Sequence, residues 1–177
     1  MKILDCTLRD GGYYTNWDFD SKLVNDYLKL TKFLPIDIVE VGYRGNKNKE
    51  SYLGEFYYLT TNNLKKIKSK IDKNKKLSVM IDLKDWKNPK ELKNNLKSCK
   101  KIVDIIRFAV NPRKTINRGK FLKEINNMGF KVAVNIMYSH LLLKNDLLIK
   151  EILKLKKFFD IIYIVDSYGT LNPILFI

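Results

Sequence analysis

Short apolar runs alternate along this chain with longer amphipathic segments that are rich in lysine. Six of the apolar runs contain many β-branched residues and predict strands. Several, such as Ile-Val-Glu-Val and Ile-Ile-Tyr-Ile-Val, are apolar on both faces, which is typical of strands buried on both sides of a parallel sheet. The predicted strands cover residues 2–7, 37–43, 77–83, 104–110, 131–137 and 161–166.

The segments between these strands have the periodicity of amphipathic helices. Leu23, Tyr27 and Leu30, for example, fall on one helical face. Pro89 suits the first turn of a helix, and Gly129 suits the position just after a helix end. The predicted helices cover residues 21–33, 62–72, 89–101, 115–128 and 141–158.

Repeated βα units of this kind build either a doubly wound open sheet or a barrel. An open sheet predicts a glycine-rich phosphate loop after the first strand, and the pair Gly11-Gly12 is too short to form one. The pattern therefore favours a (β/α)₈ TIM barrel in the α/β class. A complete barrel usually needs about 250 residues.

The chain has 177 residues, so we expect a barrel truncated to about six βα units. These units would form a single partial domain over residues 1–177 that lacks strands 7 and 8. Residues 171–177 are apolar where the next helix should begin with charged residues, which supports this expectation.

The formal net charge of +15 raises the question of a nucleic-acid or other polyanionic partner. Only five of the 34 basic residues are arginine, and the lysines are spread among asparagines on the expected solvent faces of helices. Nucleic-acid-binding proteins more often concentrate their basic residues and use arginine for bidentate contacts. The pattern favours a general lysine bias, with a polyanion-binding surface as the alternative.

The two cysteines, Cys6 and Cys99, are far apart and fit neither a disulfide framework nor a zinc motif. We expect them to be core residues. The N-terminus begins directly with a predicted strand, and no apolar run approaches the roughly 20 residues of a membrane-spanning helix. These features predict a cytoplasmic protein without a membrane partner.

Polar side chains follow almost every predicted strand. In a parallel barrel the carboxyl ends of all strands meet at one edge, where barrel active sites form. We therefore expect a functional site at this edge. The polar residues at the strand ends are Arg9, Asp10, Glu40, Tyr43, Arg44, Asp82, Lys84, Asp85, Arg107, Asn111, Asn135, Tyr138, His140, Asp166 and Ser167.

Four segments at these strand ends carry a family resemblance. They read LDCTLRDGG at 4–12, VEVG at 39–42, VNIM at 134–137 and VDSYGT at 165–170. In order and spacing they resemble the strand motifs of the DRE-TIM metallolyases, also called the HMGL-like superfamily. This superfamily includes 4-hydroxy-2-oxovalerate aldolase, hydroxymethylglutaryl-CoA lyase and the isopropylmalate synthases. The resemblance is greatest to the aldolase branch and to pyruvate carboxyltransferase-like domains.

The resemblance implies a lyase that cleaves 4-hydroxy-2-oxo acids through a pyruvate enolate. A divalent metal, Mn²⁺ or Mg²⁺ in the family, acts as a Lewis acid on the 2-oxo acid, and a guanidinium meets the enolate oxygen. By resemblance Asp10 is the metal ligand and Arg9 the enolate-stabilising catalytic residue. The alternative for these two residues is an ordinary surface ion pair.

Four further residues are candidates for substrate binding. Glu40 points into the barrel and pairs with a cation, or else is solvated. Arg107 binds a substrate carboxylate, or else bridges Glu40 or Asp166 in the lumen. Asn135 and Asp166 are pocket candidates both by their strand-end positions and by resemblance.

The chain departs from the family pattern in two places. The family's His-x-His metal motif on strand 7 has no counterpart, and the single histidine, His140, follows the fifth strand, where we expect a structural or exposed role. Tyr13 stands where family aldolases carry a proton-transfer histidine. Its phenol, with an ordinary pKa near 10, serves that catalytic role only if the pKa is lowered; otherwise Tyr13 and Tyr14 line the substrate mouth.

We therefore expect an aldolase homologue that has weak or no activity as an isolated chain. Two alternatives stay open. Another polypeptide could complete a split aldolase, or the chain could be a non-catalytic module that binds a polyanion. Unpaired edge strands would also favour a homo-oligomer.

Overall fold

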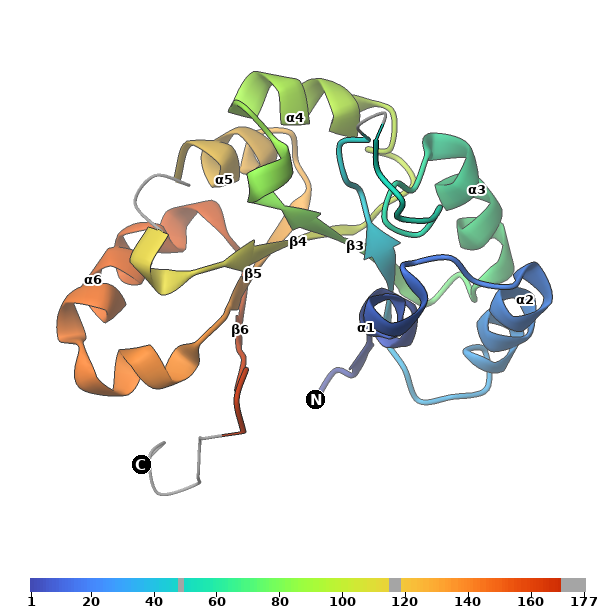
Figure 1. Ribbon diagram of the computed structural model, residues 1–177, viewed down its shortest axis with the longest axis horizontal. Helices are drawn as coiled ribbons and strands as arrows, with labels where there is room; N and C mark the ends of the chain where they lie inside the picture. The colour runs from blue at the N-terminus through green and yellow to red at the C-terminus, as the bar shows by residue number, and fades with distance from the viewer. Residues whose placement is uncertain (48–49, 115–118, 170–177) are drawn as a thin grey trace.

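The computed structural model describes residues 1–47, 50–114 and 119–169. Six parallel strands form one sheet in the order of the sequence, and the sheet curls into a half-barrel (Figure 1). This confirms the predicted parallel order and the α/β class. The strands are β1 (Leu4–Asp5), β2 (Ile38–Tyr43), β3 (Lys76–Asp82), β4 (Ile105–Val110), β5 (Lys131–Ile136) and β6 (Ile161–Ile164).

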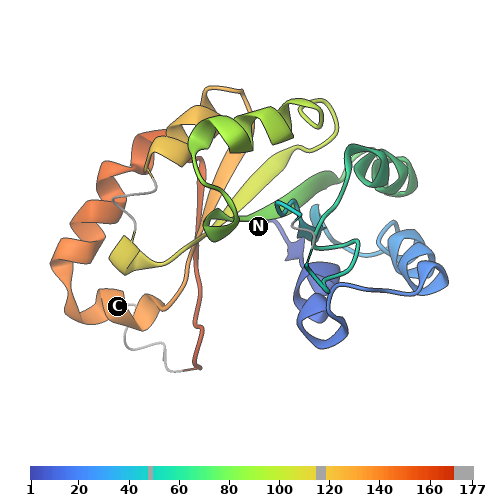
Figure 2. The same cartoon turned by 45° about the horizontal axis from the view of Figure 1, so that its top comes forward.

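Helices cover the convex side of the sheet, as Figures 1 and 2 show for α2 to α6, whereas α1 lies apart from this layer and against β2. Side-chain caps fix several helix starts: Asp20 accepts a hydrogen bond from the Leu23 amide, and Asn88 accepts one from the Glu91 amide. No helix in the described part of the chain is long and apolar enough to cross a bilayer. The helices are α1 (Thr7–Thr15), α2 (Ser21–Leu30), α3 (Thr61–Lys70), α4 (Pro89–Lys97), α5 (Gly119–Asn126) and α6 (Asp146–Lys154).

Two predicted elements differ from the structure. The first strand is only two residues long, and a helix that was not predicted, α1, begins immediately after it. The predicted helix 141–158 is divided into a 3₁₀ segment (Ser139–Lys144), α6 and a second 3₁₀ segment (Lys156–Phe158). The expectations for residues 115–118 and for the apolar run 171–177 lie outside the described residues.

Side chains alternate between the two faces of the sheet. Val39 and Val41 of β2 face the helices and are fully buried, whereas Ile38 packs on the concave side with Ile105 and Ala133. Glu40 lies on the same concave side as Ile38. The concave face therefore combines a small apolar layer with polar residues nearer the carboxyl ends of the strands.

Three aspartates connect neighbouring strands in the same way. Each lies just before a strand and accepts a hydrogen bond, at 2.7 to 2.8 Å, from a backbone amide at or immediately before the beginning of the preceding strand in the sheet. The three residues are Asp37, Asp104 and Asp160. Each pairing fixes the register of two parallel strands at their amino ends.

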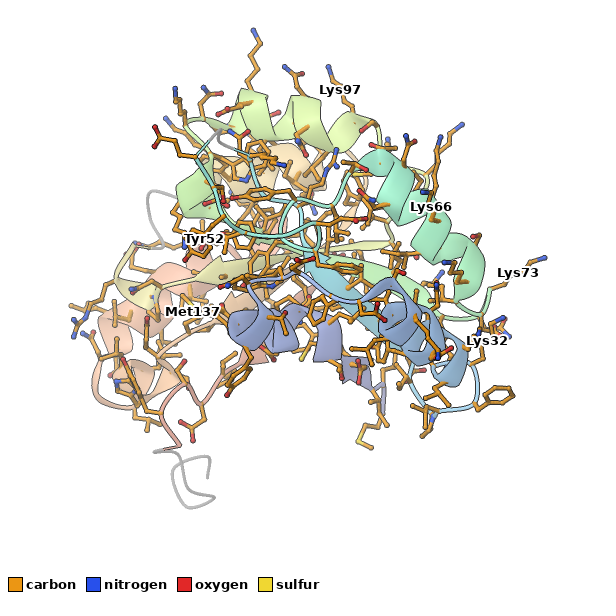
Figure 3. The ribbon with its side chains drawn as sticks, turned by 45° about the vertical axis from the view of Figure 1, so that its right-hand side comes forward. Lys32, Tyr52, Lys66, Lys73, Lys97 and Met137 are labelled. Atoms are coloured by element: carbon orange, nitrogen blue, oxygen red, sulfur yellow. The ribbon has the colours of Figure 1, made fainter. Side chains whose placement is uncertain are left out.

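The lysines mostly lie on the outside of the molecule. Figure 3 labels Lys66 and Lys97, which extend from α3 and α4 away from the sheet, together with Lys32 and Lys73. This arrangement agrees with the predicted solvent faces of the helices.

Candidate functional site

Glu40 is the centre of a buried ionic network on the concave face. Its side chain is completely buried, and Oε1 accepts hydrogen bonds from Arg9 Nε at 2.9 Å and from Arg107 Nη1 at 2.7 Å. The Ser78 hydroxyl donates to Oε2 at 3.4 Å. A buried carboxylate is tolerated only when it is paired and hydrogen-bonded. The expectation that Glu40 pairs with a cation inside the barrel is confirmed.

Arg9 reaches this network from the first turn of α1. The Trp17 indole donates to the Arg9 carbonyl at 2.9 Å and anchors the backbone there. Gly12 makes this contact possible, because a Cβ at position 12 would lie 2.1 Å from the indole ring. The helix therefore needs a glycine in its interior, despite the lower helix propensity of this residue.

The Arg9 guanidinium remains positively charged in this site. Burial lowers its pKa, but the charge and hydrogen bond of Glu40 outweigh that effect, so the pKa lies above its ordinary value. Nε donates to Glu40 and Nη1 to Asp10. No described residue accepts a hydrogen bond from Nη2, which is not among the buried atoms without a partner. This nitrogen is therefore not fully buried, although only 11% of the Arg9 side chain is exposed.

Arg107 is held on three sides within the lumen. Its Nη1 donates to Glu40 and its Nη2 to Asn135 Oδ1 at 2.5 Å. The Tyr163 ring lies against the guanidinium, 4.3 Å from ring centroid to Cζ, and contributes a cation–π contact. Nε is buried and has no hydrogen-bond partner among the described residues. Arg107 therefore forms the expected bridge to Glu40 in the lumen. Its other expected role, binding a substrate carboxylate, stays a prediction.

Asp10 lies at the open side of the network, with about half of its side chain exposed. One carboxylate oxygen pairs with Arg9, and the other accepts a hydrogen bond from the Cys6 thiol at 3.1 Å. Burial and this hydrogen bond raise the pKa of Cys6 to about 11. Cys6 is therefore a neutral partner of Asp10 and not the plain core residue expected.

The residues present do not supply a complete metal site. In the described ranges no group of three His, Cys, Asp or Glu side chains could hold a metal ion. Both oxygens of Asp10 already have partners, and Glu40 is neutralised by two arginines. A catalytic transition-metal site normally has at least three protein ligands. Asp10 could contribute one ligand, and the others would have to come from elsewhere.

An aromatic cluster borders the network at the ends of β1 and β2. The hydroxyls of Tyr13 and Tyr43 are 3.0 Å apart, and Trp17 packs edge-on against Tyr13, Tyr43 and Tyr57. Burial, and then the hydrogen bond with Tyr13, raises the pKa of Tyr43, which therefore stays protonated. Tyr13 itself is mostly exposed. A phenol at this position can meet a ligand in the mouth.

Two carboxylates lie at the carboxyl end of β3 beside this cluster: Asp82 is its last residue, and Asp85 follows three residues later. Asp82 pairs with Lys84 at 2.9 Å, and Asp85 accepts a hydrogen bond from the Tyr57 hydroxyl at 3.1 Å. Burial, followed by the charge of Asp82, raises the pKa of Asp85. The two side chains add negative charge at this side of the mouth.

Two other predicted strand-end residues, Arg44 and His140, contact residues outside the Glu40 network. Arg44 is a structural residue: it donates to Asn95 Oδ1 at 2.8 Å and to the Leu59 carbonyl in the helical layer. Asp166 is exposed, two residues beyond β6. His140 follows β5 and packs against Tyr168, with ring centroids 5.2 Å apart.

The sequence interpretation missed Ser78, Trp17 and Tyr163 as parts of the site. Ser78 and Tyr163 were detectable in principle, because strict alternation places them on the same face as Glu40 and Asn135 through the strand pairing. Trp17 had no comparable signal, since its position depends on the unpredicted helix α1.

Comparison with known proteins gives a structural relationship and no family assignment. The crystal structure of the N-terminal domain of a putative aldolase from Bacteroides vulgatus matches with a TM-score of 0.91 and 39% sequence identity. The match covers 99% of this chain and 57% of that one, so this chain spans little more than half of its neighbour's length. The two chains share the half-barrel fold, and their similarity supports a general relationship to aldolases.

A truncated 3-deoxy-D-arabino-heptulosonate 7-phosphate synthase from Thermotoga maritima is much more distant. It has a TM-score of 0.46 and 12% identity, over 77% of this chain and 40% of that chain. No protein-family model matches the sequence. No curated protein matches it either.

Proposed function

We propose that this chain forms part of a carbon–carbon lyase of the aldolase type, which binds a small 2-oxo acid and stabilises its enolate. One observation carries the proposal: a buried carboxylate, Glu40, fixes the Arg9 guanidinium at the carboxyl ends of the strands and leaves Nη2 without an acceptor among the described residues. The similarity to the Bacteroides vulgatus domain supports the same reaction class.

Arg9 acts in this proposal as a preorganised cation. Retro-aldol cleavage leaves an electron pair on the carbon beside the ketone, and the ketone oxygen becomes an enolate oxygen. A guanidinium already held in place stabilises that charge without reorganisation during the reaction. Nη2 of Arg9 donates to the enolate oxygen, while Glu40 keeps Nε and the plane of the guanidinium in place.

Glu40 and Arg107 mainly hold the Arg9 guanidinium in position. Arg107 contributes a second positive charge beside Glu40, so that Glu40 does not fully neutralise Arg9. Asn135 and Tyr163 hold Arg107 in turn. The buried part of the network, without the half-exposed Asp10, carries one net positive charge, which favours an anionic ligand such as a 2-oxo acid.

During cleavage the 4-hydroxyl proton passes to water at the open mouth as that group becomes the aldehyde carbonyl. The enolate carbon then takes up a proton, and we assign the donation of this proton to Tyr13. Its hydroxyl lies 3.0 Å from that of Tyr43, and either hydroxyl can be the donor. Tyr43 remains protonated, so it can donate to a Tyr13 oxygen that has given up its proton. Tyr13 would therefore be the residue that contacts the substrate, with Tyr43 as its buried partner.

Metal dependence is a separate proposal. In the resembling superfamily a divalent ion, Mn²⁺ or Mg²⁺, supplies Lewis-acid chemistry, and Asp10 is the residue of this chain that could ligate it. Because one carboxylate with two occupied oxygens is a poor site, we propose that the isolated chain binds such ions weakly. Further ligands would come from additional residues or from a second polypeptide beside β6 or β1.

Pyruvate binding tests the proposal directly. We expect pyruvate to shift NMR signals of residues around Arg9 in a saturable way, and the Arg9→Gln variant to lose at least about tenfold in affinity, since a hydrogen bond to a charged group is removed. The matched control is Lys29→Gln, which removes an exposed positive charge on α2. Equal affinity in the two variants would refute the role of Arg9.

A coupled pyruvate-release assay tests the incomplete metal site. The chain is incubated with 4-hydroxy-2-oxo acids and Mn²⁺ or Mg²⁺, beside an Asp10→Ala control. We expect no detectable cleavage by the chain alone. Robust turnover that the substitution abolishes would contradict the weak metal site, although it would support the aldolase reaction.

A polyanion-binding surface is the second candidate function. A cavity of about 650 Å³ between α4 and α5 is lined by five lysines and by Glu124, which pairs with Lys93. Salt-dependent retention on heparin, lost on reversing the charges of Lys90 and Lys97 and accompanied by no pyruvate binding, would favour this function. The five lysines are Lys90, Lys93, Lys97, Lys120 and Lys123.

A further inference from the structure

A second pocket lies at the same end of the sheet as Arg9, among the segments that follow β4, β5 and β6. Its volume is about 310 Å³, at the lower end of the range for small-molecule sites. None of its described lining residues is acidic. The lining residues are Asn111, Arg113, Tyr138, His140, Leu141 and Tyr168.

Two side chains in this pocket have nitrogen atoms without a hydrogen-bond partner among the described residues. Arg113 is exposed, and no described residue accepts a hydrogen bond from its guanidinium, although its backbone amide is fixed by Asn111 Oδ1 at 3.0 Å. His140 Nδ1 is buried and has no hydrogen-bond partner among the described residues. A buried polar atom without a partner in the protein is costly.

Aromatic rings form one wall of the pocket. The Tyr138 and Tyr168 rings stack at a centroid distance of 5.6 Å, and His140 leans on Tyr168. Tyr138 has a positive φ of 55°, a conformation that is uncommon and costly for a bulky residue. Hydrogen bonds from the Tyr138 amide to Ser167 Oγ and from Ser139 Oγ to the Val165 carbonyl hold the two segments together.

We propose that this pocket binds an oxyanion group, a phosphate or a carboxylate, carried by a small molecule. The guanidinium of Arg113 offers a planar fork that matches either group, and the His140 imidazole lies in the same lining, where it reports on a bound ligand. The tyrosine rings can pack against the atoms that carry the anion. The absence of acidic residues from the described lining removes the usual competitor for such an arginine.

The pocket also has a place in the reaction, and this assignment rests on the proposed aldolase function. Arg9 holds the 2-oxo acid half of the substrate at β1 and β2, while the segments after β4, β5 and β6 face the other side of the mouth. The oxyanion pocket would then hold the distal, aldehyde-derived half. The preferred substrates are 4-hydroxy-2-oxo acids that carry a second anionic group at the far end.

The single histidine makes the test specific, because the imidazole signals of His140 are the only ones in the NMR spectrum. Inorganic phosphate and, separately, acetate are titrated at constant pH and ionic strength. We expect at least one of them to shift the His140 signals in a saturable way. The relative affinities then decide between phosphate and carboxylate. Shifts that never saturate for either ion would overturn the proposal.

Three variants sharpen the result. Arg113→Gln should weaken binding about tenfold, whereas Arg113→Lys, which keeps the charge, should recover part of it. Lys22→Gln, an exposed lysine on α2, controls for net charge and should bind like the parent chain. Equal affinities for Arg113→Gln and Lys22→Gln would refute the pocket. Since Arg113 is exposed and no residue in the described ranges accepts a hydrogen bond from its side chain, its replacement should leave the thermal unfolding temperature unchanged.

The Arg9→Gln variant separates this inference from the proposed function. It should lose pyruvate binding and keep the response of His140 to the small oxyanion. If pyruvate binding is absent from the parent chain while the oxyanion response depends on Arg113, the aldolase proposal fails and the oxyanion site stands. The reverse pattern would retain the aldolase proposal and eliminate the pocket.

Discussion

Strands β4 and β6 have similar sequences but very different surroundings. The outward side chains Ile106 and Phe108 of β4 are completely buried beneath helices. The outward side chains of β6, Ile162 and Ile164, are 45% and 50% exposed. They line an apolar cavity of about 330 Å³ together with residues of α6 and the preceding 3₁₀ segment. The same apolar pattern is thus covered at the centre of the sheet and open at its edge.

This difference divides the functional site into a rigid part and a weakly supported part. Glu40, Arg107 and Asn135 lie on strands whose outer faces are fully packed, so their positions are well determined. Tyr163, which packs on Arg107, lies on β6. Elements with few buried contacts open more readily than the core. We therefore expect the β6 side of the site to move and the Glu40 network to stay fixed.

Removing a large side chain from the covered strand should have the greatest effect. Phe108→Ala should reduce the free energy of unfolding by about 4 kcal/mol, because it removes a fully buried ring and leaves a cavity. Ile164→Ala should cost less than about 1.5 kcal/mol, since half of that side chain is already exposed. Urea unfolding measures both values. Similar losses in the two variants would remove the distinction between centre and edge.

Replacing the central carboxylate should have the next largest effect. Glu40→Gln leaves buried Arg107 without a counter-charge and Arg9 with the half-exposed Asp10 alone, and it should cost about 3 kcal/mol in the free energy of unfolding. Asp10→Asn affects a half-exposed ion pair and should cost less than about 1 kcal/mol. If Asp10→Asn proved equally destabilising, the burial of charge at Glu40 would not be what holds the network.

The exposed apolar edge should promote association between molecules. An uncovered edge strand with apolar neighbours invites pairing with another chain. We expect sedimentation velocity to detect self-association that Ile164→Lys weakens by about tenfold, as expected for loss of one apolar contact. Leu30→Lys, at an exposed leucine on α2, is the control and should have little effect. A larger effect of Leu30→Lys would place the interface elsewhere.

The aspartates between strands provide a smaller, pH-dependent contrast. Burial raises the pKa of Asp104, but hydrogen bonds from Lys68 and the Leu77 amide outweigh it, and the folded-state pKa lies below the ordinary value. Its stabilising effect is therefore present above the ordinary pKa near 4 and is lost as the pH falls through the lower, folded-state value.

The Asp104→Asn variant tests this contrast. It should lose about 1 kcal/mol at pH 7 and show a weaker decline in stability under acid conditions. Asp160→Asn, which replaces the corresponding aspartate between β5 and β6, should have the smaller effect on the acid limb. Unfolding curves between pH 2 and pH 7 compare the two variants. A flat profile in the parent chain would contradict the assigned pKa.

Much of the fold could be predicted because hydrophobic periodicity is a local signal. The strands β2 and β4 lie close to their expected bounds. Short apolar runs rich in β-branched residues are typical of buried strands, so the local sequence was sufficient to predict them. The helix α1 could not be predicted in the same way. Gly11 and Gly12 locally disfavour a helix. The glycine at position 12 is explained by the packing of Trp17 against it, which depends on the folded structure.

The site was predictable to a similar extent. Strand ends placed Arg9, Glu40, Arg107 and Asn135 near one another, and the structure joins them in one network. Sequence could not show that both arginines share one oxygen of Glu40, because that depends on side-chain geometry. The aspartates before β2, β4 and β6 followed a visible pattern, Asp-Ile-Val or Asp-Ile-Ile, whose role in strand register became clear only from the hydrogen bonds.

We propose that Glu40 holds Arg9 in place to stabilise an enolate, and the binding of oxalate provides a direct test of this role. Oxalate presents two adjacent negatively charged oxygens, as the enolate of pyruvate does, whereas pyruvate has a neutral ketone. A site built for the enolate should bind oxalate more tightly than pyruvate. Arg9→Gln should then lose more affinity for oxalate than for pyruvate, measured by NMR titration. Equal losses for the two ligands, or none, would show that Arg9 does not stabilise the enolate.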